Sequence, residues 1–111
     1  MSIRELADSV LEAFAHSDLE ATERLCTEDA VVFGTDAGEV WHDRSSLVAA
    51  LDGMRELGLE ARWLEEPVRG THWVAGAAEF VLSDGSTLPV RVSMVFAGDR
   101  LVHAHYSVAV A

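Results

Sequence analysis

The sequence predicts an α+β domain in which three N-terminal helices pack on one face of a curved, mainly antiparallel sheet. Residues 1–58 contain three helical segments with capping residues and one short pair of strands. Residues 59–110 read as four antiparallel strands. Three tight turns join these strands, at Arg69-Gly70, Asp84-Gly85 and Gly98-Asp99. With 111 residues in all, we expect a single domain over residues 1–111.

The composition narrows the classes of partner. A net charge of −11 argues against nucleic acids and anionic membranes. No run of 18 apolar residues is present, and the N-terminus lacks the basic-then-apolar pattern of a signal peptide. A single cysteine, Cys26, excludes an internal disulfide and fits a reducing compartment. We therefore expect a cytoplasmic protein.

Two capping boxes mark the first two helices. In each box, the hydroxyl and the carboxylate satisfy each other's backbone N–H groups. Ser2 and Glu5 begin the first helix, and Ser17 and Glu20 begin a short second helix that ends near Cys26. The first helix has one apolar face, formed by Leu6, Val10 and Phe14.

The region between the second helix and the long strands predicts a strand pair and a third helix. Residues 29–33 read as a strand, and residues 39–42 return from the turn at 34–38. Asp43 or Ser45 is expected to cap the third helix. Its inward residues and its stop are expected to be Leu47, Leu51 and Met54, followed by Gly58.

The turns predict which residues of the sheet share a face. In a two-residue hairpin the flanking positions pair, and paired residues point to the same side. Ala78 is then expected opposite Arg91, and Arg91 opposite Tyr106. Their face is nearly uncharged, so we expect it to look toward the helices. Its members would be Ala61, Trp63, Val74, Gly76, Ala78, Phe80, Arg91, Ser93, Val95, Val102, Ala104, Tyr106 and Val108.

The opposite face is expected to be the outer surface of the sheet. It carries more large apolar groups than a solvent-exposed face needs, so we expect a homodimer through this outer face. The apolar stripe would consist of Val90, Val92, Met94, Phe96 and Leu101. His103 and His105 have the spacing of metal ligands on a strand, but we expect them to border the dimer contact instead. We expect no metal and no cofactor.

The order of elements resembles the nuclear transport factor 2-like superfamily, the conical, cystatin-like α+β domains. Residues 28–36 followed by Trp41 look like its SnoaL-like branch. Residues 98–107, with a His-x-His-x-Ser ending, look like the last strand of that branch and of kinase association domains. The resemblance implies a pocket between the sheet and the helices. The superfamily holds cyclases, isomerases, dehydratases, epoxide hydrolases and non-catalytic binding or assembly modules.

Arg91 is the main candidate for binding a ligand. A charge in the middle of an apolar face costs several kcal/mol unless it is paired. It therefore needs either an anionic ligand or an internal carboxylate, and Asp36 and Glu39 at the rim are the candidate partners. Kinase association domains resemble the chain here too, with an arginine in this place that points into the pocket.

The other candidates surround the expected pocket. Tyr106 could donate a hydrogen bond to a ligand or be a core tyrosine. Asp36 and His42 are candidate bases at the pocket mouth, where a base must come within hydrogen-bond reach of the proton it removes. The further candidate ligand-binding residues are Trp41, Trp63, Ser93 and Phe33.

Two function classes remain open. The first is a pocket protein for a small anionic or polyketide-like molecule, with cyclase, isomerase or hydrolase activity. The second is a non-enzymatic dimeric binding or assembly module, in which the pocket is closed by aromatic side chains and Arg91 is paired internally.

Overall fold

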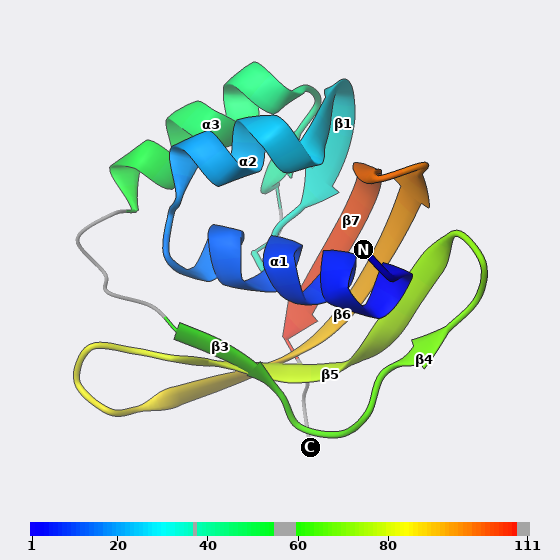
Figure 1. Ribbon diagram of the computed structural model, residues 1–111. Helices are drawn as coiled ribbons and strands as arrows, with labels where there is room; N and C mark the ends of the chain where they lie inside the picture. The colour runs from blue at the N-terminus through cyan, green and yellow to red at the C-terminus, as the bar shows by residue number, and fades with distance from the viewer. Residues whose placement is uncertain (37, 55–59, 109–111) are drawn as a thin grey trace.

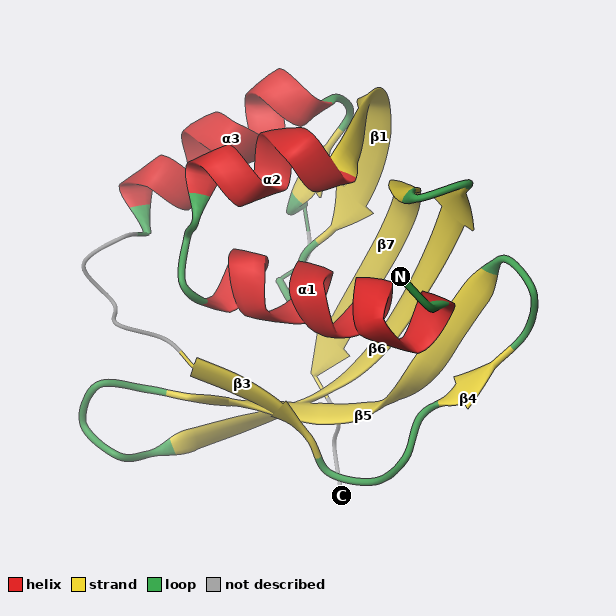
Figure 2. Ribbon diagram, in the orientation of Figure 1, coloured by secondary structure: helices red, strands yellow, loops and turns green. Residues whose placement is uncertain are grey.

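The computed structural model describes residues 1–36, 38–54 and 60–108. Within them, three helices lie on one side of a curved seven-stranded sheet, as predicted (Figures 1 and 2). The elements in chain order are α1 (Ile3–Ala15), α2 (Leu19–Leu25), β1 (Cys26–Phe33), β2 (Val40–Trp41), α3 (Arg44–Gly53), β3 (Glu60–Trp63), β4 (Val68–Arg69), β5 (Trp73–Val81), β6 (Thr87–Ala97) and β7 (Arg100–Val108).

The sheet is mixed but mainly antiparallel. Its strand order is β2-β1-β7-β6-β5-β3. The short strand β4 pairs with Val74 and Ala75 of β5, before the part of β5 that pairs with β3. The pair β1–β7 is parallel, whereas the other described pairs are antiparallel. Figure 1 shows α1 lying across the hollow of the sheet, with α2 and α3 beside β1. The helices therefore cover the inner face of the sheet.

The capping box of α1 is present as predicted. The Ser2 hydroxyl accepts the backbone N–H of Glu5 at 3.1 Å, and the Glu5 carboxylate accepts the backbone N–H of Ser2 at 3.0 Å. Leu6, Val10 and Phe14 are buried on the face toward the sheet. The cap determines where the helix begins, and the apolar face determines which side of the helix packs against the sheet.

The second capping box is wrong by one residue. Asp18 is the N-cap of α2, and its carboxylate accepts the backbone N–H of Ala21 at 3.1 Å. Ser17 instead closes α1 in a left-handed conformation, with φ 50, and is buried. In α3 the cap is Asp43, which was one of the two expected. The expected stop at Gly58 lies outside the described residues.

The hairpin between β5 and β6 closes through three residues, 83–85, rather than two. Gly85 has φ +86, whereas Asp84 is not among the residues with positive φ. A two-residue type I′ turn needs positive φ at both positions, so this loop has the three-residue form with a left-handed glycine at its end. As a result, Ala77 rather than Ala78 pairs with Arg91.

A β-bulge shifts the pairing of β6 with β7 as well. Phe96 pairs with Leu101 as expected, but the next pair is Val95 with His103. Val102 is therefore the extra residue on β7, and all pairs beyond it are displaced by one. Because side chains alternate along a strand, a displacement of one residue exchanges the two faces.

Because of these two irregularities, the face of β6 that was predicted to be the outer one packs toward the helices. Arg91, Ser93 and Val95 are exposed on the outer face, so their predicted inner position is wrong. The inward residues of β6 are Val90, Val92, Met94 and Phe96. Together with Leu101, these are the residues that were expected to form the outer apolar stripe. They belong to the hydrophobic core, so the stripe carries no argument for a dimer.

The pairing of β3 with β5 differs by two residues from the one that the turn at Arg69-Gly70 predicts, Ala61 with Ala78 and Trp63 with Gly76. Ala61 pairs with Phe80 instead, and Trp63 pairs with Ala78. A displacement of two preserves the faces, so the predicted inward position of these residues is confirmed: Trp63 packs against the core and Ala78 is buried. Ala104 and Tyr106 of β7 are also buried on the inner face, as predicted.

Candidate ligand-binding cavity

A cavity of about 390 Å³ opens between α1, α3, the β1–β2 loop and the inner face of the sheet. This volume lies within the range of small-molecule sites. The wall is mostly apolar and aromatic. The lining residues are Phe14, Val32, Gly34, Thr35, Asp36, Glu39, Trp41, Leu47, Leu51, Met54, Phe80, Leu82, Leu88 and Tyr106.

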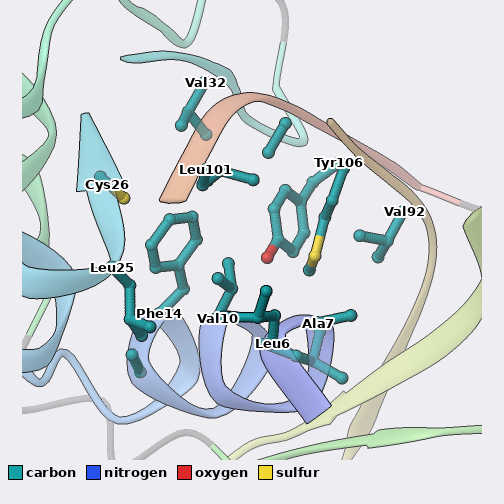
Figure 3. Packing of buried hydrophobic residues seen from close by; sticks show 14 of the residues in the cluster. Leu6, Ala7, Val10, Phe14, Leu25, Cys26, Val32, Val92, Leu101 and Tyr106 are labelled. Carbon is teal, nitrogen blue, oxygen red and sulfur yellow. The ribbon is translucent and has the colours of Figure 1, made fainter. Parts of the chain in front are cut away.

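Tyr106 is the polar group of the cavity's buried wall. It is 4% exposed, and its ring lies between Phe14, at 6.0 Å between ring centroids, and Phe80, at 5.9 Å. Figure 3 shows the ring reaching from β7 toward α1, with the hydroxyl near Val10 and Phe14. Within the described part of the chain, this buried hydroxyl has no hydrogen-bond partner.

Burial raises the pKa of Tyr106 well above its ordinary value, and the neighbouring Cys26 acts in the same direction. The charged phenolate is disfavoured because the site offers it no water and no cation. The side chain is therefore a protonated phenol at neutral pH, with an O–H available as a donor.

The rim of the cavity is the β1–β2 loop, which carries two carboxylates. Glu39 is half-buried, and its Oε1 accepts the backbone N–H of Asp36 at 2.8 Å. Gly34 makes this packing possible, because a Cβ there would stand 2.8 Å from Glu39 Oε1 and 2.9 Å from the Trp41 ring. The loop thus holds the Glu39 carboxylate and the Trp41 indole against the same stretch of backbone.

Three of the predicted site residues meet in this cavity: Asp36, Trp41 and Tyr106. Glu39, which was considered only as a partner for Arg91, also lines it. Phe14, Phe80 and Leu88 also line the cavity, although they were not among the residues predicted for the site. Their inward positions on α1, β5 and β6 mark them as core residues, and nothing in the sequence shows that a core position also faces a cavity.

Arg91 and Ser93 do not reach the cavity. Arg91 pairs with Ala77 and Ser107 on the outer face and is exposed. Its predicted role in the pocket is wrong for the reason given above, since the two one-residue displacements turn it to the other side of the sheet. Ser93 follows it on the same face.

Phe33 and Trp63 also lie elsewhere. The Phe33 ring packs on the outer face between His103, at 5.5 Å, and His105, at 5.3 Å. The Trp63 indole N–H donates to the Asp8 carboxylate at 2.7 Å, which ties β3 to α1. Both aromatic side chains therefore make packing or hydrogen-bond contacts elsewhere in the fold, and neither lines the cavity.

His42 belongs to a second hollow, an open groove of about 830 Å³ at the start of α3. It is exposed there, among the carboxylates of Glu23, Glu28, Asp29 and Asp43. Although this groove is larger, it is polar and open to solvent. The Arg44 side chain in it already donates to the backbone carbonyls of Glu23 and Cys26, both at 3.3 Å. The apolar cavity is the better candidate because it can exclude water from a ligand.

The described residues contain no group of three or more histidine, cysteine or acidic side chains that could hold a metal ion. His103 and His105 flank Phe33 on the outer face instead of converging on a common point. No described helix is long and apolar enough to cross a membrane.

Solved structures with the same fold cover nearly the whole chain at low sequence identity. A candidate isomerase of the SnoaL-like family from Agrobacterium tumefaciens has a TM-score of 0.80 at 11% identity, with 96% of each chain covered. A candidate polyketide cyclase from Sinorhizobium meliloti has a TM-score of 0.75 at 16% identity, with 92% of this chain and 93% of that chain covered.

A third structure is a hypothetical protein from Catenulispora acidiphila with a ketosteroid isomerase-like fold, in complex with trimethylamine. Its TM-score is 0.79 at 11% identity, with 96% of this chain and 85% of that chain covered. No curated protein sequence matches the chain. A nuclear transport factor 2-like protein from Cytophaga hutchinsonii also shares the fold, with a TM-score of 0.75. The sequence pattern of the SnoaL-like domain matches residues 3–111, and the chain therefore belongs to the SnoaL-like domain family.

Proposed function

We propose that the protein binds a small, mainly apolar molecule in the cavity and that Tyr106 donates a hydrogen bond to it. The observation that carries this proposal is the Tyr106 hydroxyl, which is buried without a described partner in the wall of an apolar cavity. Leaving a buried polar group unpaired costs about 1–3 kcal/mol. A phenylalanine would fill the same place without that cost, so the hydroxyl is best explained by a ligand.

Access to the hydroxyl requires movement of the rings beside it. Phe14 and Phe80 flank Tyr106, and the hydroxyl itself is buried. An entering ligand would displace one of these rings and take its place against the phenol. Aromatic and aliphatic side chains on all sides favour a ligand with a planar or alicyclic apolar body.

The ligand differs from the anion that the sequence suggested. That expectation depended on Arg91, which is exposed on the other side of the sheet. The charges that line the cavity in the described residues are the carboxylates of Asp36 and Glu39. They repel an anion, so a molecule without negative charge, such as a polyketide-like ketone, suits the site better. The trimethylamine complex of the Catenulispora relative supports the capacity of this fold to bind small molecules.

The same groups support an enolisation reaction. Asp36 or Glu39 would remove a proton next to a ligand carbonyl, and Tyr106 would donate to the oxygen that gains the negative charge. The proton moves to the carboxylate while the C–H electrons form the enolate double bond, and its return to another carbon completes an isomerisation. Relatives described as a candidate isomerase and a candidate polyketide cyclase are consistent with this chemistry.

Binding of 2-tetralone, a bicyclic ketone, tests the proposal. Isothermal titration should give one binding site on the wild type. Leu88→Trp, which fills the cavity from β6, should abolish that binding. Thr87→Trp, which adds the same side chain on the exposed face of the strand, should leave it unchanged. Equal binding to both tryptophan variants would contradict the proposal.

Exchange of the α-protons of 2-tetralone in D₂O, followed by NMR, tests the enolisation step. The wild type should speed the exchange above the buffer rate, and Asp36→Asn with Glu39→Gln should remove this increase. Binding without any increase would limit the function to that of a binding protein.

A second proposal concerns assembly as a dimeric module. Trp73 and Val95 pair directly across β5 and β6, and they are 43% and 39% exposed on the outer face. His103 pairs with Val95 on the next strand. This patch, rather than the stripe predicted from the sequence, could support a homodimer through the outer sheet face. Light scattering should then give a dimer mass for the wild type and a monomer mass for Val95→Asp.

A further inference from the structure

The charges around the cavity have one sign. Asp36 and Glu39 carry two negative charges at the rim, and none of the described lining residues is an arginine, lysine or histidine. The chain as a whole has a net charge of −11. A negative field around a low-dielectric cavity raises the local concentration of cations and lowers that of anions.

Glu39 is the better placed of the two carboxylates to meet a bound cation. It is half-buried, whereas Asp36 is exposed. The Asp36 N–H holds Glu39 Oε1, which fixes the position of the carboxylate without neutralising its charge. One carboxylate oxygen therefore remains available to a ligand.

An aromatic ring lies beside this carboxylate. The Trp41 ring and Glu39 Oε1 both crowd the space above Gly34, and both line the cavity. A carboxylate next to an indole is a good environment for an organic ammonium group, which can pair with the charge and lie against the ring. Deeper in the cavity, Tyr106 forms part of the wall, and its buried, unpartnered hydroxyl becomes a second polar contact once a flanking ring moves aside.

We infer that the ligand is an organic amine cation, with its ammonium group at Glu39 and Trp41 and its apolar body extending toward Tyr106. This inference rests on the proposed binding function and adds the charge of the ligand. It predicts a preference among molecules of the same shape that differ only in charge.

The test uses three derivatives of tetralin substituted at carbon 2. The amine is a cation at neutral pH, the alcohol is uncharged, and the carboxylic acid is an anion. Isothermal titration should show that the wild type binds the amine about tenfold more tightly than the alcohol and the carboxylate most weakly. Higher ionic strength should reduce the preference for the amine.

Glu39→Gln is the informative variant, because the amide oxygen can still accept the Asp36 N–H while the charge is lost. It should abolish the preference for the amine and leave the affinity for the alcohol unchanged. Asp99→Asn, in the turn between β6 and β7, removes one negative charge away from the cavity and should keep the preference.

The outcomes separate this inference from the proposed function. Equal affinity for amine and alcohol, or tightest binding of the carboxylate, overturns the inference. In that case, loss of binding in Leu88→Trp would still show that the cavity is the binding site. A preference that survives Glu39→Gln also overturns it. If none of the three molecules binds the wild type, or if Leu88→Trp binds them all unchanged, the proposed function fails together with the inference.

Discussion

The two faces of β6 differ in their surroundings, although their side chains alternate along one strand. Met94 on the inner face is fully buried, whereas Val95, the next residue, is 39% exposed. Arg91 on the outer face is in solvent, while its neighbour Val92 is buried in the core. Adjacent positions on this strand therefore carry very different consequences for stability, and only the inner face can contribute to the cavity wall.

The largest expected effect comes from introducing a carboxylate on the inner face of β6, compared with introducing it on the outer face. Met94→Asp places a carboxylate in the core without a partner, and we expect it to cost at least about 4 kcal/mol, which would unfold most of the protein. In the monomer, Val95→Asp places the same group in solvent and should change the free energy of unfolding by less than about 1 kcal/mol.

Urea unfolding followed by circular dichroism measures both free energies of unfolding. Similar losses for the two variants would mean that the faces of β6 are not divided as described. A larger loss for Val95→Asp than for Met94→Asp would restore the register expected from the sequence.

The second effect is a loss of stability at alkaline pH, caused by a buried group on the helix side of the sheet. Burial raises the pKa of Cys26 from its ordinary value of 9.0 to about 11. The unfolded chain therefore loses this proton at a lower pH than the folded chain does. The stabilisation is present in full below pH 9 and is lost as the pH rises from about 9 to about 11.

The size of this loss is roughly 3 kcal/mol by linkage. Unfolding free energies measured from pH 8 to pH 11 for the wild type and for Cys26→Ala would reveal it. The variant lacks the thiol, so its stability should fall less over this range even if it is lower at pH 8. Parallel curves would show that Cys26 does not titrate as a buried thiol.

The third prediction compares two glycines. Gly34→Ala should destabilise the protein by about 1–3 kcal/mol, since the new Cβ would collide with Glu39 and Trp41 at the cavity rim. Gly53→Ala at the end of α3 meets no atom within 4 Å and should be neutral or stabilising by up to about 1 kcal/mol. Thermal unfolding of both variants is the measurement. A harmless Gly34→Ala would show that the rim is loosely packed.

Much of the fold could be predicted because the element pattern does not depend on exact register. The helices followed from caps and apolar spacing, and the strands followed from turn residues. The face assignment of β3 survived an error of two residues in its pairing with β5, because side chains repeat with that period. The same kind of error on β6, by a single residue, exchanged its faces.

The error on β6 has a definite physical origin. The pair Asp84-Gly85 fits both a two-residue turn and the end of a three-residue loop, and only the φ of Asp84 distinguishes them. The bulge at Val102 has no signal in the local sequence. The alternation of large apolar residues from Val90 to Phe96 did contain the answer, since such a row usually belongs to the core.

The site was predictable where it lies on a loop or on β7. Asp36 and Trp41 flank the turn between β1 and β2, and Tyr106 lies on the part of β7 after the bulge, where its inward position was assigned correctly. Arg91 failed because its role depended on the register of β6. The size of the cavity depends on how helices and sheet pack together, which no single segment determines.

The smallest expected effect tests the central claim most directly. Tyr106→Phe removes only the buried hydroxyl, and the free energies of unfolding of wild type and variant can be compared without ligand and with 2-tetralone. If the hydroxyl binds a ligand, Tyr106→Phe without ligand should be more stable than the wild type by about 1 kcal/mol. The variant should also bind 2-tetralone about tenfold more weakly than the wild type does. A ligand-free variant that is less stable than the wild type by about 1 kcal/mol or more, with unchanged affinity for 2-tetralone, would contradict the account. That result would show that the hydroxyl stabilises the folded chain and does not bind a ligand.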